Sequence, residues 1–568
     1  MIMLVAGSLY LSTLLPGPYW GEGPLLTLCS VTLGISHPPG YPLYCQFAKG
    51  VTSLPIGDYS QRANVFSAWC SAISLAVIFW LIADERRIIG GVIAAGIVAT
   101  SPTLWRAATM SEVYSMNLMI VLLILFCIKR RNHQIRLSLI TAAAFLLGLS
   151  CGLHLTIVLL LPSLMIMAYG FRQFGLHGFA KAACLSLCFM ILGMSILLYD
   201  PIRALSDAPV KWGMPSSLDR FWTLITAQEE ALPSFSTGLH DGKTITVAML
   251  SLIRGYAQDI SLAVILVTLV LLPAAIRKNL QWSLALLVGC LAYTVPVALY
   301  HTNEPEFFSL PVPVFLGLLC GEGVAGAFDS SLIGGFPQRK RVFLLILLGI
   351  VIHRNLDSAK TWEQLTARKQ QVPRIYGKLI LENLPSNGVL VTERSDLAFL
   401  LWYLQDCEGY LDQRALFFRH LFSFNWADQW HRRKFSWLTY PNVSKELFED
   451  TERFNTTYLE ALILCNRSIA PTLLADPGTF FLLQPRLNQR CSAARNGWLI
   501  SLDCGIEIDD YHIDTNRLPR IPLVDDLSCD VISKHLWGLS VVEYEVGDKS
   551  AGDALMGLAG EWKAAAIR

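Results

Sequence analysis

The stretch from Gly21 to Leu43 reads GEGPLLTLCSVTLGISHPPGYPL. Its first half predicts a short helix over 25–33, because Pro24 stands at the start and Gly34 follows the end. Its second half holds three prolines and one glycine within residues 38–42. Each proline removes a backbone donor and favours extended geometry in the residue before it, so the helix is expected to stop there and a rigid turn to follow.

The rest of the chain indicates a membrane protein. Of its 568 residues, 53% are hydrophobic and 16% are charged, and the mean hydropathy is +0.46, above the value of an ordinary soluble domain. A net charge of +1 gives no basic field for nucleic acid, so no nucleic-acid partner is expected. About eleven apolar stretches are predicted to span the bilayer: 2–16, 63–83, 88–104, 114–128, 136–151, 153–170, 178–198, 259–276, 281–300, 307–327 and 341–353.

The basic residues between these stretches predict the orientation. Most of them fall on one side of an eleven-span thread, which the positive-inside rule makes cytoplasmic. The opposite side then receives the loops 17–62 and 199–258 and everything after about residue 354. Residues 1–353 are therefore expected to form a multi-span membrane domain, and residues 354–568 an extracytoplasmic domain.

The C-terminal part is predicted to be a small α/β domain. Short apolar runs at 388–392 and 462–465 resemble strands, and 397–405 has a helical pattern. Short β-branched runs between helical periods favour a sheet covered by helices. The cysteines show no CxxC pair or Cys/His cluster, so no metal site is predicted.

Two residues of the quoted stretch are candidates for chemistry. Glu22 is expected at the N-terminus of the short helix, where the macrodipole favours a carboxylate, and it would suit a general base; a helix cap is the alternative. His37 precedes the proline turn and is either catalytic or a structural hydrogen-bonding group. Irregular backbone at membrane depth is tolerated beside a wet cavity, so the turn is expected to line a pocket.

The run from Gly21 to Leu43 resembles, without gaps, the signature G-D-S-G-E-L-x(7)-G-x-x-H-P-P-G-Y-P-L of a family of multi-span O-mannosyltransferases and bacterial relatives, in the GT-C class of glycosyltransferases. Weaker matches continue along the chain at Arg62-Ala-Asn64, at 111–117, at 152–156, at 201–204 and at Trp212-Gly213. The resemblance implies a GT-C-like α-helical polytopic fold. Both acidic positions of the signature differ, since Glu22 replaces the aspartate and Leu25 replaces the glutamate.

The resemblance also implies an activity, in which a sugar, mannose among the candidates, moves from a polyprenyl- or dolichyl-phosphate carrier to an acceptor hydroxyl with inversion. The carrier and a protein or glycan acceptor are the expected partners, and no cofactor is expected. The predicted catalytic residues are Glu22, His37 and Arg203. Arg203 is among them because a guanidinium suits a leaving phosphate. The predicted substrate-binding residues are Pro38, Pro39, Tyr41, Arg62, Asn64, Glu112, Tyr114, His154 and Trp212.

Two other functions are compatible with these features. A transporter or flippase for a lipid-linked saccharide would also need a polar cavity, but it should show paired halves with broken helices, and no inverted repeat is evident. A catalytically degenerate scaffold is the second, because Leu25 removes one carboxylate. Either a bacterial inner membrane or an endoplasmic reticulum membrane is the expected location.

Overall fold

The fold was obtained as a computed structural model. It describes the chain except for residues 84–87, 130–136, 169–174, 230–241, 301–303, 330–337, 339–370, 411–413, 449, 488–491, 497, 504–524, 547 and 568.

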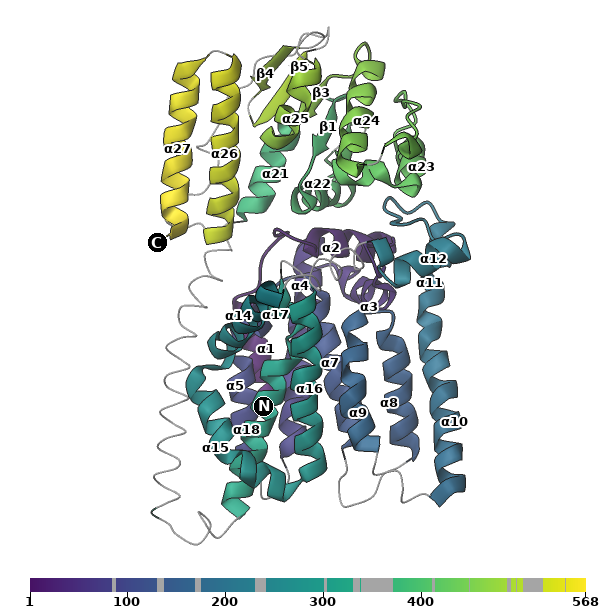
Figure 1. The fold of residues 1–568 in the computed structure, drawn as a ribbon, viewed down its shortest axis with the longest axis vertical. Helices are drawn as coiled ribbons and strands as arrows, with labels where there is room; N and C mark the ends of the chain where they lie inside the picture. Colours follow the sequence, from purple (N-terminus) through teal and green to yellow (C-terminus); the bar gives the residue numbers. More distant parts are fainter. Residues whose placement is uncertain are drawn as a thin grey trace.

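The first part of the chain is a bundle of helices (Figure 1). Its helices are α1 (Ile2–Ser12), α2 (Gly23–Thr32), α3 (Pro42–Thr52), α4 (Tyr59–Ile82), α5 (Ile88–Ala99), α6 (Pro102–Thr109), α7 (Val113–Ile128), α8 (Leu137–Ser150), η1 (Leu155–Leu160), α9 (Leu161–Ala168), α10 (Gly175–Met194), η3 (Ser195–Leu198), α11 (Tyr199–Ala204), α12 (Leu218–Ile225), α14 (Gly242–Ile260), α15 (Leu262–Lys278), α16 (Leu280–Leu299), α17 (Pro305–Phe308) and α18 (Pro311–Asp329).

Several of these helices are suited to a bilayer. Four in the described part of the chain are long and apolar enough to span it, namely α4, the run His177–Ala204, α16 and α18. The bent pairs α5 with α6 and α14 with α15 raise this number to as many as six, and five further apolar helices are shorter. The count of about eleven spans stays a prediction, and its last stretch, 341–353, lies outside the described residues.

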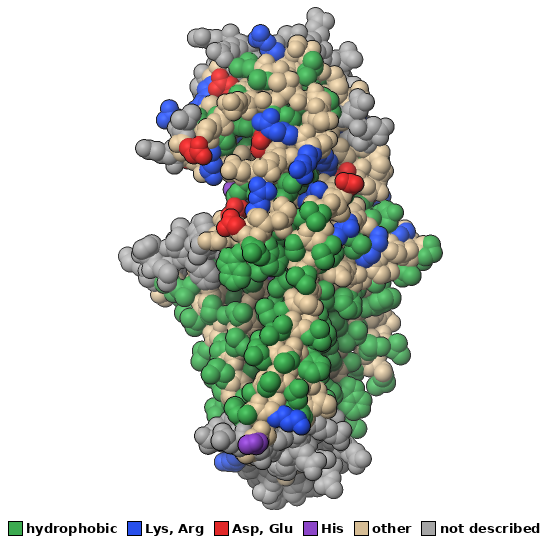
Figure 2. All heavy atoms as spheres, turned by 90° about the vertical axis from the view of Figure 1, so that its right-hand side faces the viewer, with side chains coloured by type: hydrophobic (Ala, Val, Ile, Leu, Met, Phe, Trp, Pro, Cys, Tyr) green, Lys and Arg blue, Asp and Glu red, His purple; other side chains and the backbone are tan. Residues whose placement is uncertain are grey.

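The outer surface of the bundle is apolar. Figure 2 shows hydrophobic side chains covering the helical body, whereas charged side chains gather mainly over the upper part of the molecule. On α10, Leu187, Ile191 and Leu192 are each more than half exposed. An exposed apolar belt of this kind is stable in lipid and costly in water, so the protein is a multi-pass membrane protein.

The predicted short helix is α2, and it ends as the sequence indicates, with one difference. The left-handed residue at its end is Leu33, with φ of +52°, rather than Gly34. Gly34 is needed for space, because a Cβ there would lie 2.7 Å from the carbonyl oxygen of Val210. The 199–258 loop pairs with the chain just after α2, since the Ile35 N–H donates to the Val210 carbonyl oxygen at 3.0 Å.

The C-terminal part is an α/β domain, as predicted. Its five-stranded sheet has the order β2-β1-β3-β5-β4, with β1 parallel to β2 and β3, and β5 antiparallel to β3 and β4. Its elements are α21 (Val372–Glu382), β1 (Val389–Thr392), α22 (Ser395–Glu408), β2 (Ala415–Phe418), η5 (Arg419–Ser423), α23 (Asn425–Lys434), η6 (Lys445–Leu447), α24 (Thr451–Asn466), β3 (Thr472–Leu474), α25 (Pro477–Leu487), β4 (Ser492–Asn496), β5 (Leu499–Asp503), α26 (Asp526–Val546) and α27 (Lys549–Ile567).

Two of the three local predictions for this domain are confirmed. The run at 388–392 contains β1, and 397–405 lies within α22. The run at 462–465 is not a strand, because it lies near the end of α24. That helix buries Tyr458, Leu459 and Leu462 on one face, and this helical spacing outweighs the strand preference of a four-residue apolar run.

One hydrophobic core joins the first loop to the C-terminal domain, while the helical bundle has a core of its own. Helix α2 packs against α22, and Leu25 and Leu28 are fully buried among side chains of the C-terminal domain. Polar contacts cross the same junction: Tyr19 Oη to Asp525 Oδ1 at 2.5 Å, Trp20 Nε1 to Ser528 Oγ at 2.9 Å, and Arg374 Nη1 to Asp58 Oδ2 at 2.9 Å. The C-terminal domain therefore lies directly on the first loop, as Figure 1 shows.

Candidate active site at the junction of the two parts

A cavity of about 720 Å³ lies between the first loop, the helical bundle and the C-terminal domain. Residues of the proline turn form one wall, and α22 contributes Ser395 and Asp396 from above. Much of the remaining lining is apolar, including Leu155, Val158 and Val297. The void beside the proline turn, which the sequence predicts, is therefore present.

Glu22 and His37 contact each other in this cavity. His37 Nε2 lies 3.0 Å from Glu22 Oε2. Glu22 occupies the N-cap position of α2, but its side chain makes no capping hydrogen bond and turns to the histidine instead. The carboxylate is therefore available to a ligand in the cavity rather than used to cap the helix.

Burial and His37 act in opposite directions on Glu22. Burial disfavours the charged carboxylate, but the attraction of His37, helped by the more distant His154, outweighs it, so the pKa of Glu22 is below its ordinary value. Glu22 is thus ionised near neutral pH, which is the state that a proton acceptor needs.

Aromatic rings of the proline turn and of α22 hold His37 in place. The ring of His37 stacks on Phe399 of α22, with centroids 6.1 Å apart, and meets the edge of Tyr41 at 5.0 Å. Gly40 has φ of +91°, and a Cβ on it would lie 2.9 Å from a carboxylate oxygen of the buried Asp200. Only glycine meets both requirements without strain, and this accounts for a glycine within the prolines.

Glu304, in the segment before α17, brings a further carboxylate to the cavity. Burial and repulsion from Glu22 raise the pKa of Glu304 to about 7, although Arg106 opposes the shift. Arg106 of α6 lines the same cavity, and its Nη1 lies 3.2 Å from Glu306 Oε1. Its buried Nε has no hydrogen-bond partner among the described residues. The cavity is thus lined by Glu22, Glu304 and Asp396 and by a cation with an unused donor.

Most of the predicted site residues do line this cavity. Those that the structure brings together there are Glu22, His37, Pro38, Pro39, Tyr41, Tyr114 and His154. His154 Nδ1 lies 2.8 Å from Thr156 Oγ1, and this contact orients its ring.

Arg203 is not brought together with Glu22, contrary to the prediction. Its Nε donates to the Leu33 carbonyl at 2.6 Å and its Nη2 to the Thr32 carbonyl at 3.1 Å. These are carbonyls at the C-terminal end of α2, where a cation is favoured by the helix dipole. The guanidinium therefore stabilises the end of α2, at the opposite end of that helix from Glu22.

Four other predicted residues also lie outside the cavity. Arg62 donates to the carbonyls of Thr52, Ile56 and Gly57, and so fixes the loop before α4. Asn64 Nδ2 donates to the Leu15 carbonyl at 2.8 Å. Glu112 is buried at the start of α7, where its N–H donates to Ser67 Oγ at 3.3 Å. Trp212 lines a different cavity, although its ring lies 6.2 Å from that of His37.

Arg106 and Glu304 were missed as site residues. In the sequence both lie between predicted spans, Arg106 between 88–104 and 114–128 and Glu304 between 281–300 and 307–327. A charged side chain in a short turn beside two spans was the available signal, because such a group needs water or a partner.

Sequence comparisons find similarity to a protein O-mannosyl-transferase. Residues 25–175 match the family model described as "Protein O-mannosyl-transferase TMEM260 N-terminal domain". Protein O-mannosyl-transferase TMEM260 of Mus musculus is 23% identical over 461 residues, which cover 72% of this chain and 60% of that relative. The chain thus spans about 60% of the length of this curated relative.

A solved structure shares the fold. The crystal structure of ArnT from Cupriavidus metallidurans bound to undecaprenyl phosphate superposes with a TM-score of 0.52 at 11% identity, over 89% of this chain and 97% of that one. The sequence match and the shared fold together confirm that the chain resembles the multi-span O-mannosyltransferase family and has a GT-C type fold.

Proposed function

We propose that this protein is a membrane glycosyltransferase that moves a sugar from a lipid-phosphate carrier to an acceptor hydroxyl. The observation that carries the proposal is the pairing of Glu22 with His37 at 3.0 Å on the wall of the 720 Å³ cavity. The pair keeps a partly buried carboxylate ionised beside a space large enough for a sugar phosphate. That combination suits general-base catalysis.

The apolar lining supports a lipid carrier. Val158 lines the cavity and is 53% exposed, so the apolar wall continues to the outer surface of the bundle. A polyprenyl chain can lie along that surface in the bilayer while its phosphate enters the cavity. The structurally similar ArnT was solved with undecaprenyl phosphate, and the curated relative is named an O-mannosyl-transferase, which supports a polyprenyl-phosphate mannose as the first donor to test.

In this mechanism Glu22 accepts the proton of the acceptor hydroxyl. The hydroxyl oxygen forms a bond to the anomeric carbon on the face opposite the phosphate, while the bond from that carbon to the phosphate oxygen breaks. Both electrons of the broken bond leave with the lipid phosphate, and the configuration inverts. Arg106 is well placed to offset the charge that grows on this phosphate, and preorganised charge of this kind is a large catalytic contribution.

Glu304 takes part in the site without replacing the base. With a pKa of about 7 it exists in both protonation states near neutral pH, so it can donate or accept a hydrogen bond to a sugar hydroxyl. It brings a second carboxylate to the cavity from a distant part of the chain, whereas Leu25 lies fully buried in the core between α2 and the C-terminal domain. The loss of a carboxylate at position 25 therefore gives no support to the scaffold alternative.

The test uses the full chain in lipid nanodiscs, a radiolabelled polyprenyl-phosphate mannose and a mixture of threonine-containing peptides. Glu22→Gln keeps the shape of the side chain and should lower the transfer rate by about 10²- to 10⁴-fold. Glu561→Gln, which changes an exposed residue of α27, is the matched control and should transfer at the normal rate. Undiminished transfer in Glu22→Gln rules out this base, and no transfer from any lipid-phosphate sugar rules out the enzyme.

A further inference from the structure

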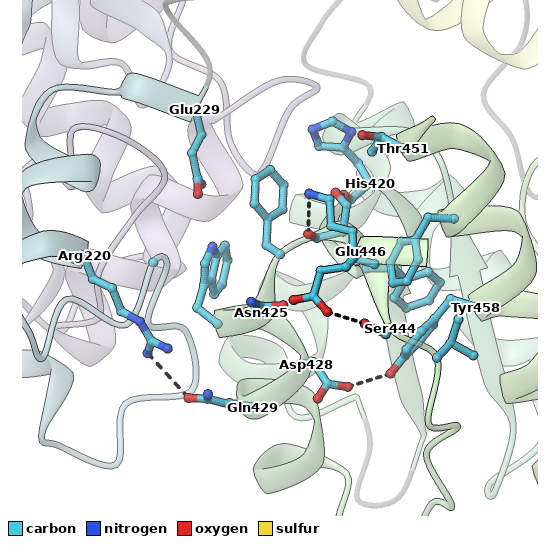
Figure 3. Close-up of a pocket in the computed structure, with 18 of the residues that line it drawn as sticks. Arg220, Glu229, His420, Asn425, Asp428, Gln429, Ser444, Glu446, Thr451 and Tyr458 are labelled. Carbon is cyan, nitrogen blue, oxygen red and sulfur yellow. Dashed lines mark hydrogen bonds between the residues drawn. The ribbon is translucent and has the colours of Figure 1, made fainter. Parts of the chain in front are cut away.

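A second cavity, of about 1120 Å³, lies between the 199–258 loop and the C-terminal domain (Figure 3). We call it the interdomain cleft. One wall is formed by residues 212–229, and the other by η5, α23 and residues 441–458. Arg220 of the first wall donates to Gln429 of the second across 3.5 Å, as Figure 3 shows.

The interdomain cleft meets the candidate active site at the proline turn. Pro38 lines both cavities. The next residue back along the chain is His37, the partner of Glu22, and Trp212 of the cleft packs edge-on against the His37 ring. A ligand in the cleft would therefore end beside the carboxylate that the proposed mechanism uses as its base.

The place of the cleft in the fold favours a water-soluble occupant. Its described lining comes from the first loop, the 199–258 loop and the C-terminal domain, and it includes no residue of the candidate spans. The active-site cavity, by contrast, has an apolar wall that reaches the surface of the bundle. The two cavities thus suit two substrates that arrive from different sides, one from lipid and one from water.

The side chains of the cleft suit a polypeptide. Aromatic rings line it, among them Phe424, Trp426 and Tyr458, and they offer the apolar area that dominates peptide recognition. Charges of both signs stand beside them: Asp428 pairs with Arg432 at 2.7 Å, and the cleft also holds Lys445. A mixed lining fits the mixed side chains of a peptide better than an uncharged glycan.

The backbone of one wall is also open to pairing. The segment 441–444 has no regular secondary structure, and Ser444 at its end is extended, with φ of −84° and ψ of +128°. The N–H groups of Asn442 and Val443 take part in no backbone hydrogen bond within the described chain. An extended segment with free backbone groups can bind a second extended chain by strand addition.

We propose that the interdomain cleft binds the acceptor as an extended polypeptide segment, and that a serine or threonine of this segment reaches Glu22 past Pro38. The inference rests on the proposed transferase function for its final step. The binding step is independent of it, because the cleft can be tested for peptide binding without any sugar donor.

The experiment uses the full chain in nanodiscs and a biotinylated peptide pool with a central threonine and five randomised residues on either side. Ser444→Trp and Thr223→Trp each place a large ring in the cleft from opposite walls. Ser468→Trp, at an exposed position after α24, is the matched control. Peptide binding, mannose transfer to peptide, and release of free mannose from the donor without acceptor are measured for each.

We expect both cleft variants to lose at least tenfold in peptide binding and in transfer, while the release of free mannose stays within twofold of normal and the control is unchanged. Equal peptide binding in the cleft variants and the control overturns the proposal. Binding of chitohexaose but not of peptides, blocked by the same variants, also overturns it and assigns a glycan. Blocked peptide binding without any transfer or release in the unmodified protein would support the cleft while refuting the transferase.

Discussion

The pairing of Glu22 with His37 makes His37→Gln the most informative substitution. Glutamine keeps a polar side chain but removes the charge, so burial of Glu22 is no longer opposed and its pKa should rise. A carboxylate and a protonated imidazole 3.0 Å apart attract by about 5 kcal/mol at an effective dielectric constant of about 20. The Glu22 side chain is 36% exposed, and solvent screening reduces this attraction to on the order of 1 to 2 kcal/mol.

An energy of about 1.4 kcal/mol corresponds to a factor of ten. The ionised base is lost as pH falls, so the rate of His37→Gln relative to the unmodified protein should decline between about pH 7.5 and about pH 4, by up to about tenfold once pH is below the pKa of Glu22 in both proteins. The assay is kcat/KM for mannose transfer across this range. His154→Gln is the comparison, because His154 acts more weakly on Glu22 and should change the profile less. An equal loss at every pH would refute the electrostatic role of His37.

Three further outcomes are expected, each measured by thermal unfolding of the purified protein in detergent. Leu25→Glu should lower the free energy of unfolding by about 3 to 5 kcal/mol, because an unpaired charge enters a fully buried position. The same substitution should not raise the transfer rate. A stable variant with faster transfer would contradict this account. Glu304→Gln should stabilise the protein at about pH 8.5 and change its stability little at about pH 5. The reason is that the raised pKa of Glu304 makes its ionised form costly above about pH 7. Equal changes in stability at the two pH values would show that Glu304 does not titrate as described. Gly40→Ala should cost about 2 kcal/mol or more, given its φ of +91° and the nearby Asp200 carboxylate, whereas Gly50→Ala, at an exposed helical position with open space around it, should be neutral or stabilising.

Much of the local structure could be predicted because it depends on local sequence. Pro24 lies in the first turn of α2 and Gly34 follows its end, and Pro38 and Pro39 interrupt regular structure before α3 begins at Pro42. The apolar run at 388–392 and the helical pattern at 397–405 became β1 and α22. The position of Glu22 and His37 beside a cavity follows from the same stretch.

The composition of the site was decided only by tertiary structure. Arg106 and Glu304 line the same cavity as Glu22 although they lie far from it along the chain, and no pattern around either residue shows which cavity it will share. Arg203 has the charge that a phosphate needs, but the carbonyls at the end of α2 lie closer to it and take its donors. Local patterns specify backbone conformation, whereas the partners of a side chain depend on how distant segments pack. For this protein the sequence determined the proline turn and the place of Glu22 and His37 beside it, and packing brought Arg106 and Glu304 to the same cavity and formed the cleft.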